Sequence, residues 1–470
     1  MIARHHNHNI PDTYENFRQA SCRDCNIKFQ AQRNEITVIC HSGAGYDWSL
    51  ILSSISSKYK ISVLATSSEK YICLKIGCFR FIDSYKFLNA SLADVVSSLP
   101  RQKFHHLRRF FGDRSQLLFN KGYFCYSYLD GWGKMRQPLP KREAFYNDLT
   151  EKHLTKAQYK QCETVYNAFK CKNLLNYLSV YLYCDVLHLA DVFENFRVEF
   201  METYNLDPVN YCTIGSLSMD AMLSHSGVKL ETIQDMDIYQ WLETSIIGGI
   251  CNIGQRYAKA NHPGVPDYNP KLPTEYLFYG DLNQLYPSTF LYKMPIGEFQ
   301  WIDISIDEIM KVDPDGDYGY FLEVDFHYPE SIHEETRYLP LAPHKVSLHQ
   351  EMMSPYQKEN FPPMTKAETK LCLTMYDKAN YILHHRTLIL YVQLGLVITK
   401  IHRVLKFKQA HFLRDFFIYN NALRRDAIRN KNHFRKALFK SVLCNTWGKF
   451  IENPRKYILL IETTLLGFSI

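Results

Sequence analysis

The sequence has 470 residues, of which 46% are apolar and 22% charged, a composition that excludes a disordered or low-complexity chain and indicates several packed domains. The start of the chain lacks the apolar core of a secretion signal, and the longest apolar-rich run, residues 387–398, is too short to span a bilayer, so we expect a nuclear or cytoplasmic protein with no membrane partner. Thirteen scattered cysteines indicate reduced thiols rather than a disulfide framework.

The net charge of +7 is concentrated near the C-terminus. Residues 400–456 contain fifteen Lys or Arg and three acidic residues, a net charge of +12, so the rest of the chain carries −5. Neutralising phosphates and releasing counterions supplies most of the affinity for nucleic acids, so this segment predicts a phosphate-rich partner. The alternative is a solvated charged surface, which would normally interleave both signs.

The N-terminal 30 residues contain side chains that zinc prefers. Two cysteines stand at a Cys-x2-Cys spacing after a cluster of histidines, and a Zn²⁺ site needs four such ligands. The candidate ligands are His6, His8, Cys22 and Cys25. The alternative, unliganded histidines at a frayed terminus, is favoured on these residues alone.

Residues 31–205 predict an α/β unit. Strand-like runs at 35–42 and 70–84 precede a long helical pattern at 174–200. Tyr181 and Asp185 lie four apart on that helix and therefore share a face, where such a pair can orient water at a metal. A Gly-rich turn presents Asp47 as another candidate metal carboxylate. In isolation each feature is also compatible with an ordinary surface.

A region richer in Pro and Gly follows and predicts a linker between domains. Strand patterns resume at 276–281 and 318–326, and after residue 365 the pattern is mostly helical. Asp281 follows Gly280 at the end of the first of these predicted strands, where a carboxylate can approach Mg²⁺. The alternative, an Asp that caps the short helix after it, is favoured on this stretch alone.

The basic segment predicts one amphipathic helix. At about 100° per residue, four cations fall within about 60° of one another, and an apolar stripe lies opposite them. The cations are Arg425, Arg429, Lys436 and Lys440, and the apolar residues are Leu423, Ala427, Phe434 and Leu438. Aligned cations repel each other, so we interpret the stripe as a binding surface for a polyphosphate or a nucleic-acid backbone.

Taken in order, these features resemble the protein-primed family B DNA polymerases, most closely those of self-synthesising Polinton/Maverick-like DNA transposons. "GDLNQLYPS" at 280–288 is similar to the first palm motif. The resemblance implies that Asp281 binds catalytic Mg²⁺, that Leu282 and Leu285 contact the nucleotide, and that Tyr286 excludes ribose.

The basic segment ends in "KSVLCNTWGKF" at 440–450, which is similar to the fingers motif of the same polymerases. The resemblance places Lys440 on the triphosphate, assisted by Arg425 or Arg429, with Trp447 and Gly448 against the new base pair. The runs at 139–150 and 206–223 also resemble the transposon branch.

Four upstream motifs resemble the proofreading exonuclease and the linker of this family. "HSGAGYDWSLIL" assigns Asp47, and "YLYCDVLHLADVFENFR" assigns Tyr181 and Asp185, to the metal-dependent exonuclease site. "SLADV" implies that Ser91 and Leu92 hold single-stranded DNA, and "IIGGICNIGQRY" at 246–257 implies that Gly248 and Gly249 contact DNA.

The resemblance implies a multidomain protein of α/β and α+β class, with an RNase H-like 3′–5′ exonuclease domain followed by a right-hand palm and helical fingers. The expected segments are a zinc-site-like remnant at 1–30, the exonuclease-like domain at 31–205, a linker and terminal-protein-contacting region at 206–273, part of the palm with an insertion at 274–400, the fingers at 401–450 and a return to the palm at 451–470. The expected partners are template and primer DNA, dNTPs and a terminal protein that primes synthesis.

Several departures from the family pattern limit the expected activity. Cys444 stands in place of Asn in the fingers motif, Ile246 in place of Tyr in the linker, and Ser42 in place of Asn in the second exonuclease motif. The first exonuclease motif, Asp-x-Glu, and the second palm motif, Tyr-x-Asp-Thr-Asp, are missing, so we expect a chain truncated at both ends.

Two-metal catalysis needs more carboxylates than Asp281 alone, so we expect poor polymerisation and a vestigial exonuclease. The alternative function is a catalytically dead nucleic-acid-binding remnant of such a polymerase. A third hypothesis is a zinc-dependent nuclease built on the N-terminal His and Cys residues.

Overall fold

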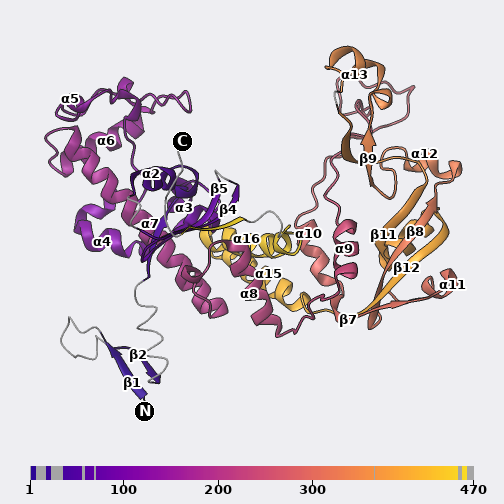
Figure 1. Ribbon diagram of the computed structural model, residues 1–470. Helices are drawn as coiled ribbons and strands as arrows, with labels where there is room; N and C mark the ends of the chain where they lie inside the picture. The colour runs from indigo at the N-terminus through magenta and orange to yellow at the C-terminus, as the bar shows by residue number, and fades with distance from the viewer. Residues whose placement is uncertain are drawn as a thin grey trace. The chain divides into compact units, whose positions relative to one another are not determined.

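The computed structural model describes residues 2–6, 17–22, 35–55, 59–67, 70–364, 366–453 and 458–462. The chain divides into two compact units, the first formed by Met1–His225 and Tyr419–Ile470 and the second by Ser226–Ile418. Each unit contains both helices and sheets (Figure 1). The predicted fold class, a multidomain mixture of α/β and α+β structure, is confirmed.

A mixed five-stranded sheet lies in the first unit. Its strands follow the order β13 (Ile458–Glu462), β4 (Ile61–Ser67), β5 (Lys70–Ile76), β6 (Phe79–Asp83) and β3 (Ile36–Cys40). All neighbours are antiparallel except β3 and β6, which are parallel. Alternate residues of β4 are buried, as expected for a strand with one face on a core, and helix α2 (Asp47–Ser54) inserts Trp48 into this core.

The longest helix of the first unit is α7 (Leu174–Tyr204), which confirms the helix predicted at 174–200. Its buried side carries Phe193, Phe196 and Phe200, and it packs against α3 (Leu92–Ser98) and α4 (His105–Phe111). Asp191 accepts hydrogen bonds from the backbone N–H groups of His106 (2.7 Å) and Leu107 (3.0 Å), which fixes the start of α4 against α7.

The first unit also contains five further helices. They are α5 (Trp132–Met135), α6 (Lys156–Ala168), α8 (Ile214–Ser226), α15 (Arg414–Arg429), which begins in the second unit, and α16 (His433–Phe450). Tyr204 of α7 donates a hydrogen bond to Asn420 of α15 (2.5 Å), and Thr446 of α16 to the Ser218 carbonyl of α8 (3.4 Å). These contacts join α7, α8, α15 and α16.

The second unit is built on a four-stranded antiparallel sheet. The strand order is β11 (Lys378–His384), β8 (Tyr318–His327), β12 (Val397–Ala410) and β7 (Met294–Ile302), and β8 confirms the strand predicted at 318–326. Helix α9 (Met236–Ser245) packs on this sheet through Trp241, whose ring lies 4.8 Å from that of Trp301. Helix α14 (His385–Gln393) follows β11 directly.

Short elements complete the second unit. They are α10 (Leu285–Ser288), α11 (Ile306–Ile309), α12 (His333–Thr336), α13 (Pro355–Asn360) and the antiparallel pair β9 (His344–Leu348) and β10 (Glu368–Cys372). In the first unit, β1 (Ile2–His6) and β2 (Phe17–Cys22) form an antiparallel hairpin.

One sequence prediction about the second unit is wrong, and another is wrong in part. Residues 276–281 form no strand, and Phe278 and Tyr279 are 92% and 96% exposed. A strand needs a ladder of hydrogen bonds to a neighbour, and no described strand pairs with this stretch. The segment after residue 365, predicted as mostly helical, contains the helices α14, α15 and α16, which confirm that pattern in part. It also contains β10, β11 and β12, because pairing with β8 and β9 overrides local helix propensity there.

No helix in the part of the chain that the structure describes is long and apolar enough to cross a membrane.

Candidate active-site groups

Asp185 and Tyr181 lie one turn apart on α7, as predicted, and a lysine from another segment joins them. The Nζ atom of Lys121 lies 2.5 Å from Oδ2 of Asp185 and 5.2 Å from the centre of the Tyr181 ring. Oδ1 of Asp185 is buried and has no hydrogen-bond partner among the described residues. The arrangement leaves one carboxylate oxygen for a further ligand.

Tyr181 is enclosed by this group. Its side chain is only 7% exposed, and burial together with the Asp185 charge raises the pKa of Tyr181 to about 12. Tyr126 pairs with it through a side-chain hydrogen bond and an edge-to-face ring contact with centres 6.1 Å apart. The Tyr181 hydroxyl therefore stays protonated at neutral pH and can donate a hydrogen bond.

Asp47 is the first residue of α2 and is exposed. The turn before it is held by Asp83 at the end of β6, whose buried carboxylate accepts hydrogen bonds from the N–H groups of Ser42 (2.8 Å) and Ala44 (3.1 Å). A Cβ on Gly43 would lie 2.6 Å from Cβ of Cys40, so only glycine fits this position. The turn therefore presents Asp47 to solvent on a fixed backbone.

His41 links this turn to the segment of Ser91. Its Nδ1 lies 2.9 Å from the Ser84 hydroxyl, and its Nε2 lies 3.1 Å from the Ala90 carbonyl. Burial lowers the pKa of His41 and the Lys121 charge lowers it further, whereas Asp83 raises it. The positive charge of Lys121 therefore acts both on Asp185 and on His41, which precedes the turn that carries Asp47.

Ser91 serves as the N-cap of α3. Its hydroxyl accepts a hydrogen bond from the Asp94 N–H (3.1 Å) and donates one to Oδ2 of Asp94 (2.6 Å), while Leu92 is half-buried. Binding of single-stranded DNA by these two residues stays a prediction.

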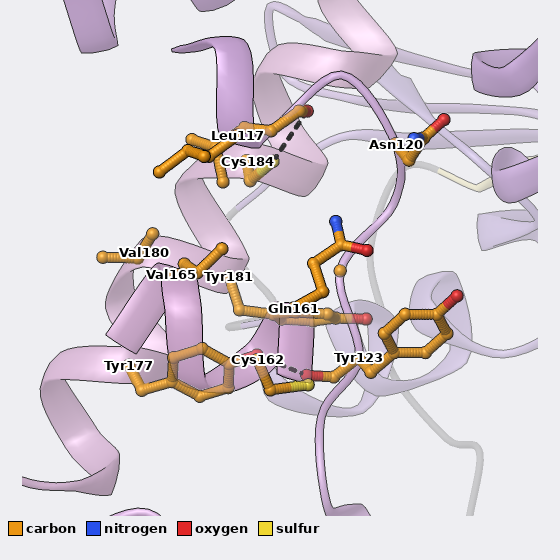
Figure 2. A pocket seen from close by; sticks show the side chains of 12 residues that line it. Leu117, Asn120, Tyr123, Gln161, Cys162, Val165, Tyr177, Val180, Tyr181 and Cys184 are labelled. Carbon is orange, nitrogen blue, oxygen red and sulfur yellow. Dashed lines mark hydrogen bonds between the residues drawn. The ribbon is translucent and has the colours of Figure 1, made fainter. Parts of the chain in front are cut away.

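A cavity lies beside Tyr181 in the first unit. Figure 2 shows the side chains that line it, which are mainly apolar ones such as Val165 and Val180, together with the polar side chains of Gln161 and Tyr123. Its volume of about 20 Å³ holds about one water molecule, too little for a nucleotide. The cavity therefore adds no substrate pocket to the Asp185 group.

Sequence reasoning missed Lys121, Tyr126, His41 and Asp83. Lys121 is 64 residues from Asp185, and no local pattern signals such a pair. The neighbouring Gly122 lies close to Tyr181, since a Cβ there would be 3.3 Å from the ring, but a single glycine in the sequence does not indicate such a contact. Asp83 stands at the end of a predicted strand, which was the one available clue.

The predicted single helix with a cationic stripe is two helices. Helix α15 ends at Arg429 and α16 begins at His433. Between them Lys431 adopts a left-handed backbone (φ 54°), and Asn432 caps α16 by accepting a hydrogen bond from the Arg435 N–H (3.0 Å). An asparagine side chain competes with the helix backbone for hydrogen bonds, which explains the break.

The predicted sorting of side chains in this segment is nevertheless confirmed. Arg425 and Arg429 are exposed on α15, and Lys436 and Lys440 are exposed on α16. The opposite residues Ala427, Phe434 and Leu438 are buried and Leu423 is half-buried. Each helix therefore presents a pair of cations one turn apart.

Trp447 and Gly448 lie two turns after Lys440 on α16 and are half-buried. A Cβ on Gly448 would meet nothing within 4 Å, so packing does not require glycine there. Arg435 pairs with the buried Glu199 of α7 at 3.1 Å, which holds α16 on α7.

Asp281 lies in the second unit, on exposed irregular backbone. The N-cap position of α10 is Gln284, with φ of 58°, so Asp281 does not cap that helix and the alternative interpretation is wrong. Leu282, Leu285 and Tyr286 are exposed as well.

Gly249 and Tyr286 meet within the second unit. A Cβ on Gly249 would lie 3.0 Å from the Tyr286 hydroxyl, whereas Gly248 stands in open space. A larger residue at 249 would push the Tyr286 hydroxyl away. Gly249 and Tyr286, which the sequence assigned to separate motifs, are therefore neighbours.

The described residues contain no group of three His, Cys, Asp or Glu that could hold a metal ion. Mg²⁺ is usually held by one or two carboxylates with waters and substrate phosphates. The exposed Asp281 and the buried, unpartnered Oδ1 of Asp185 could therefore each supply one carboxylate ligand to such a site.

The predicted zinc site has no support. His8 and Cys25 lie outside the described residues. His6 pairs with Phe17 and Cys22 pairs with Ile2, so His6 and Cys22 occupy opposite ends of the hairpin, roughly 13 Å apart at about 3.3 Å per residue. One zinc ion with ligand bonds of about 2.0–2.3 Å does not join two such positions.

The sequence profile of the family "DNA polymerase type B, organellar and viral" matches residues 27–465, and the chain belongs to this family.

Solved structures of phi29 DNA polymerase are similar to this chain. An orthorhombic crystal form is 12% identical, with a TM-score of 0.47, and the match covers 96% of this chain and 68% of that chain. The complex with primer-template DNA is 14% identical (TM-score 0.45; 94% and 64% covered), and the ternary complex with incoming nucleotide substrates is 15% identical (TM-score 0.46; 93% and 63% covered). The chain thus spans about two thirds of the length of these polymerases. A search of curated proteins found no matching relative.

Proposed function

We propose that this chain contributes to template-directed DNA synthesis as part of a protein-primed family B polymerase that replicates a mobile element. The contact of Gly249 with Tyr286 carries the proposal, because it joins the linker motif to the palm motif through the residue expected to select deoxyribose. Membership of the type B family over residues 27–465 supports it. The partners in this proposal are primer-template DNA, dNTPs and a terminal protein.

In the proposed reaction the primer 3′-oxygen bonds to the α-phosphate of a dNTP, and the bond to the leaving pyrophosphate breaks. Asp281 would hold Mg²⁺ with the substrate phosphates, and the ion would supply neutralisation of phosphate charge. Lys440, with Arg425 or Arg429, would donate hydrogen bonds to the triphosphate, since these cations are exposed.

Tyr286 would exclude ribonucleotides. Its ring is 52% exposed and its hydroxyl lies against Gly249, so the side chain is available to a sugar yet limited in movement on one side. A 2′-hydroxyl on the incoming sugar would clash with the ring, whereas a deoxyribose would not. Trp447 and Gly448 are proposed to lie against the new base pair.

The Asp185 group is proposed to be the remnant of a 3′–5′ exonuclease. The buried, unpartnered Oδ1 of Asp185 would accept a cation, Tyr181 would orient the attacking water, and Asp47 would supply a second carboxylate. Ser91, Leu92 and Gly248 would contact the DNA strand.

A catalytically dead nucleic-acid-binding remnant is the second candidate. It is favoured by the solitary Asp281, since the described residues place no cluster of carboxylates around it and two-metal chemistry needs more than one. The exposed cations of α15 and α16 would keep affinity for nucleic acid without turnover.

Primer extension separates the two candidates. The full chain is mixed with primer-template DNA, dNTPs and Mg²⁺, and Asp281→Asn is compared with Asp303→Asn, which alters another exposed aspartate of the same unit. The polymerase proposal expects extension that is lost in D281N and kept in D303N. Extension that persists in D281N overturns the site, and DNA binding without extension by the natural chain supports the remnant.

A further inference from the structure

Residues 124–142 of the first unit, apart from Tyr126, belong to none of the groups assigned above, and they continue the segment that begins at Lys121. The whole segment, 121–142, contains five Lys or Arg and one acidic residue, whereas the chain outside residues 400–456 has a net charge of −5. The segment therefore forms a local positive patch on a part of the protein that is acidic overall.

Trp132 is the most conspicuous residue of this segment. It is the first residue of the short helix α5 and is 81% exposed, and its side chain makes no hydrogen bond or ring contact with any residue that the structure describes. Exposing an indole to water forgoes the stabilisation that burial of a large aromatic side chain provides. An exposed aromatic ring beside cations is the arrangement on which nucleic-acid bases stack.

Arg136 stands four residues after Trp132 and retains helical backbone, so the two side chains share a face. The guanidinium of Arg136 and the ammonium of Lys141 are exposed and have no ion-pair partner in the described part of the chain. A base on the indole would therefore place its phosphate near a free guanidinium. Such charges suit phosphates, which Arg can bind through two parallel hydrogen bonds.

This segment is held in place. Lys134 donates a hydrogen bond to the Tyr128 carbonyl (2.9 Å) and pairs with Asp130 (2.8 Å), and the Leu174 N–H at the start of α7 donates to the Gln137 carbonyl (2.7 Å). Helix α5 also packs against α7. Trp132 is thus presented on an anchored segment, which lowers the entropic cost of binding a ligand.

The anchored segment contacts α7 at Leu174, and Asp185 lies further along the same helix. Leu174 and Asp185 are eleven residues apart on α7, or about 16 Å at 1.5 Å per residue. About five stacked nucleotides at roughly 3.4 Å each span that length. Tyr126, which is 60% exposed and pairs with Tyr181, lies in the same segment as Trp132 and adds a second ring next to the Asp185 group.

We propose that Trp132 and Arg136 form a separate binding site for single-stranded nucleic acid, which holds the strand several nucleotides away from the end that reaches Asp185. The assignment of a strand end to Asp185 rests on the proposed function. Duplex DNA fits this site poorly, because its bases are already stacked and cannot cover the indole.

The test measures the affinity of the full chain for labelled oligothymidylates of about 3 and about 15 nucleotides by fluorescence anisotropy. Trp132→Ala should raise the Kd of the longer oligonucleotide about 5- to 100-fold, the usual effect of losing one stacked base, and leave that of the shorter one unchanged. Trp132→Phe should keep most of the affinity. Arg136→Gln should reduce the slope of log affinity against log salt by about 0.7, the loss of one phosphate contact.

Leu149→Ala is the matched control, since Leu149 is an apolar side chain of the same unit that is 96% exposed. The inference is overturned if W132A binds the longer oligonucleotide within about twofold of the natural chain, or weakens both lengths equally while circular dichroism stays native. Failure of the proposed assignment of a strand end to Asp185 gives a different result, because the shorter oligonucleotide would then not bind the natural chain, whereas the longer one still would.

Discussion

Lys121 and Asp185 form an ion pair of 2.5 Å across 64 residues of sequence, and the pair defines one edge of the candidate exonuclease group. The lysine occupies Oδ2 and leaves Oδ1 without a partner among the described residues. It also faces the ring of Tyr181, which lies one turn away on α7. One cation thereby orients both side chains that the sequence proposed for hydrolysis.

Replacing Lys121 should impair hydrolysis of single-stranded DNA more than binding. In Lys121→Met the Asp185 carboxylate loses its partner and its orientation, so we expect kcat to fall about 100-fold. Nuclease assays at saturating oligonucleotide measure this effect. Lys160→Met on α6 removes an exposed lysine and should keep full activity; equal losses in both variants would contradict the assignment.

Gly43 should tolerate no side chain. In Gly43→Ala the new Cβ would lie 2.6 Å from Cβ of Cys40 and 2.8 Å from Nε1 of Trp48, and we expect the free energy of unfolding to fall by about 1–3 kcal/mol. Gly45→Ala, two residues later, meets nothing within 4 Å and is the matched control. Urea unfolding of both variants measures the difference, and similar midpoints would refute the crowding at Gly43.

The pair of Glu199 and Arg435 should stabilise the contact of α7 with α16. Arg435→Met leaves the buried Glu199 without its cation, and we expect a loss of about 1–3 kcal/mol in unfolding free energy. A double-mutant cycle with Glu199→Gln isolates the interaction, because the double variant should recover part of the loss. Strictly additive effects would show that the two side chains do not interact.

Acid should destabilise the second unit through His384. Its side chain accepts a hydrogen bond from the Arg386 N–H (3.1 Å) as the N-cap of α14, which requires an unprotonated nitrogen. Burial, together with the positive charges of His385 and Arg386, lowers the pKa of His384 to about 3 from its ordinary value of 6.5. The rings of Phe321 and Phe407 also pack against it.

Because the folded pKa lies below the unfolded one, this contribution to stability is complete above pH 6.5 and is lost as the pH falls from 6.5 toward 3. Between pH 7 and pH 5 we expect a loss of about 2 kcal/mol from this residue. Urea unfolding at the two pH values measures it. His384→Asn keeps a cap acceptor and cannot titrate, so the variant should lose less stability over this range; an unchanged dependence would exclude His384 as the cause.

Local periodicity predicted a substantial part of the fold. The 3.6-residue repeat of apolar residues gave the position of α7, and alternation gave β8. The same repeat sorted the exposed cations of α15 and α16 from the buried Phe434 and Leu438, even though the break at Asn432 was missed. These features depend on neighbours in the sequence, so the sequence contains the information needed to find them.

By itself the sequence determined the family, since its profile places the chain among the type B polymerases, and its motifs proposed Asp281, Lys440, Asp47 and Asp185 as the residues that carry chemistry. Only the tertiary structure decided that Lys121 reaches Asp185, that Gly249 lies against Tyr286, and that residues 276–281 form no strand. The physical reason is that ion pairs, close contacts and strand ladders each need a partner from a distant segment, and the partner's position is set by packing of the whole unit rather than by local preference.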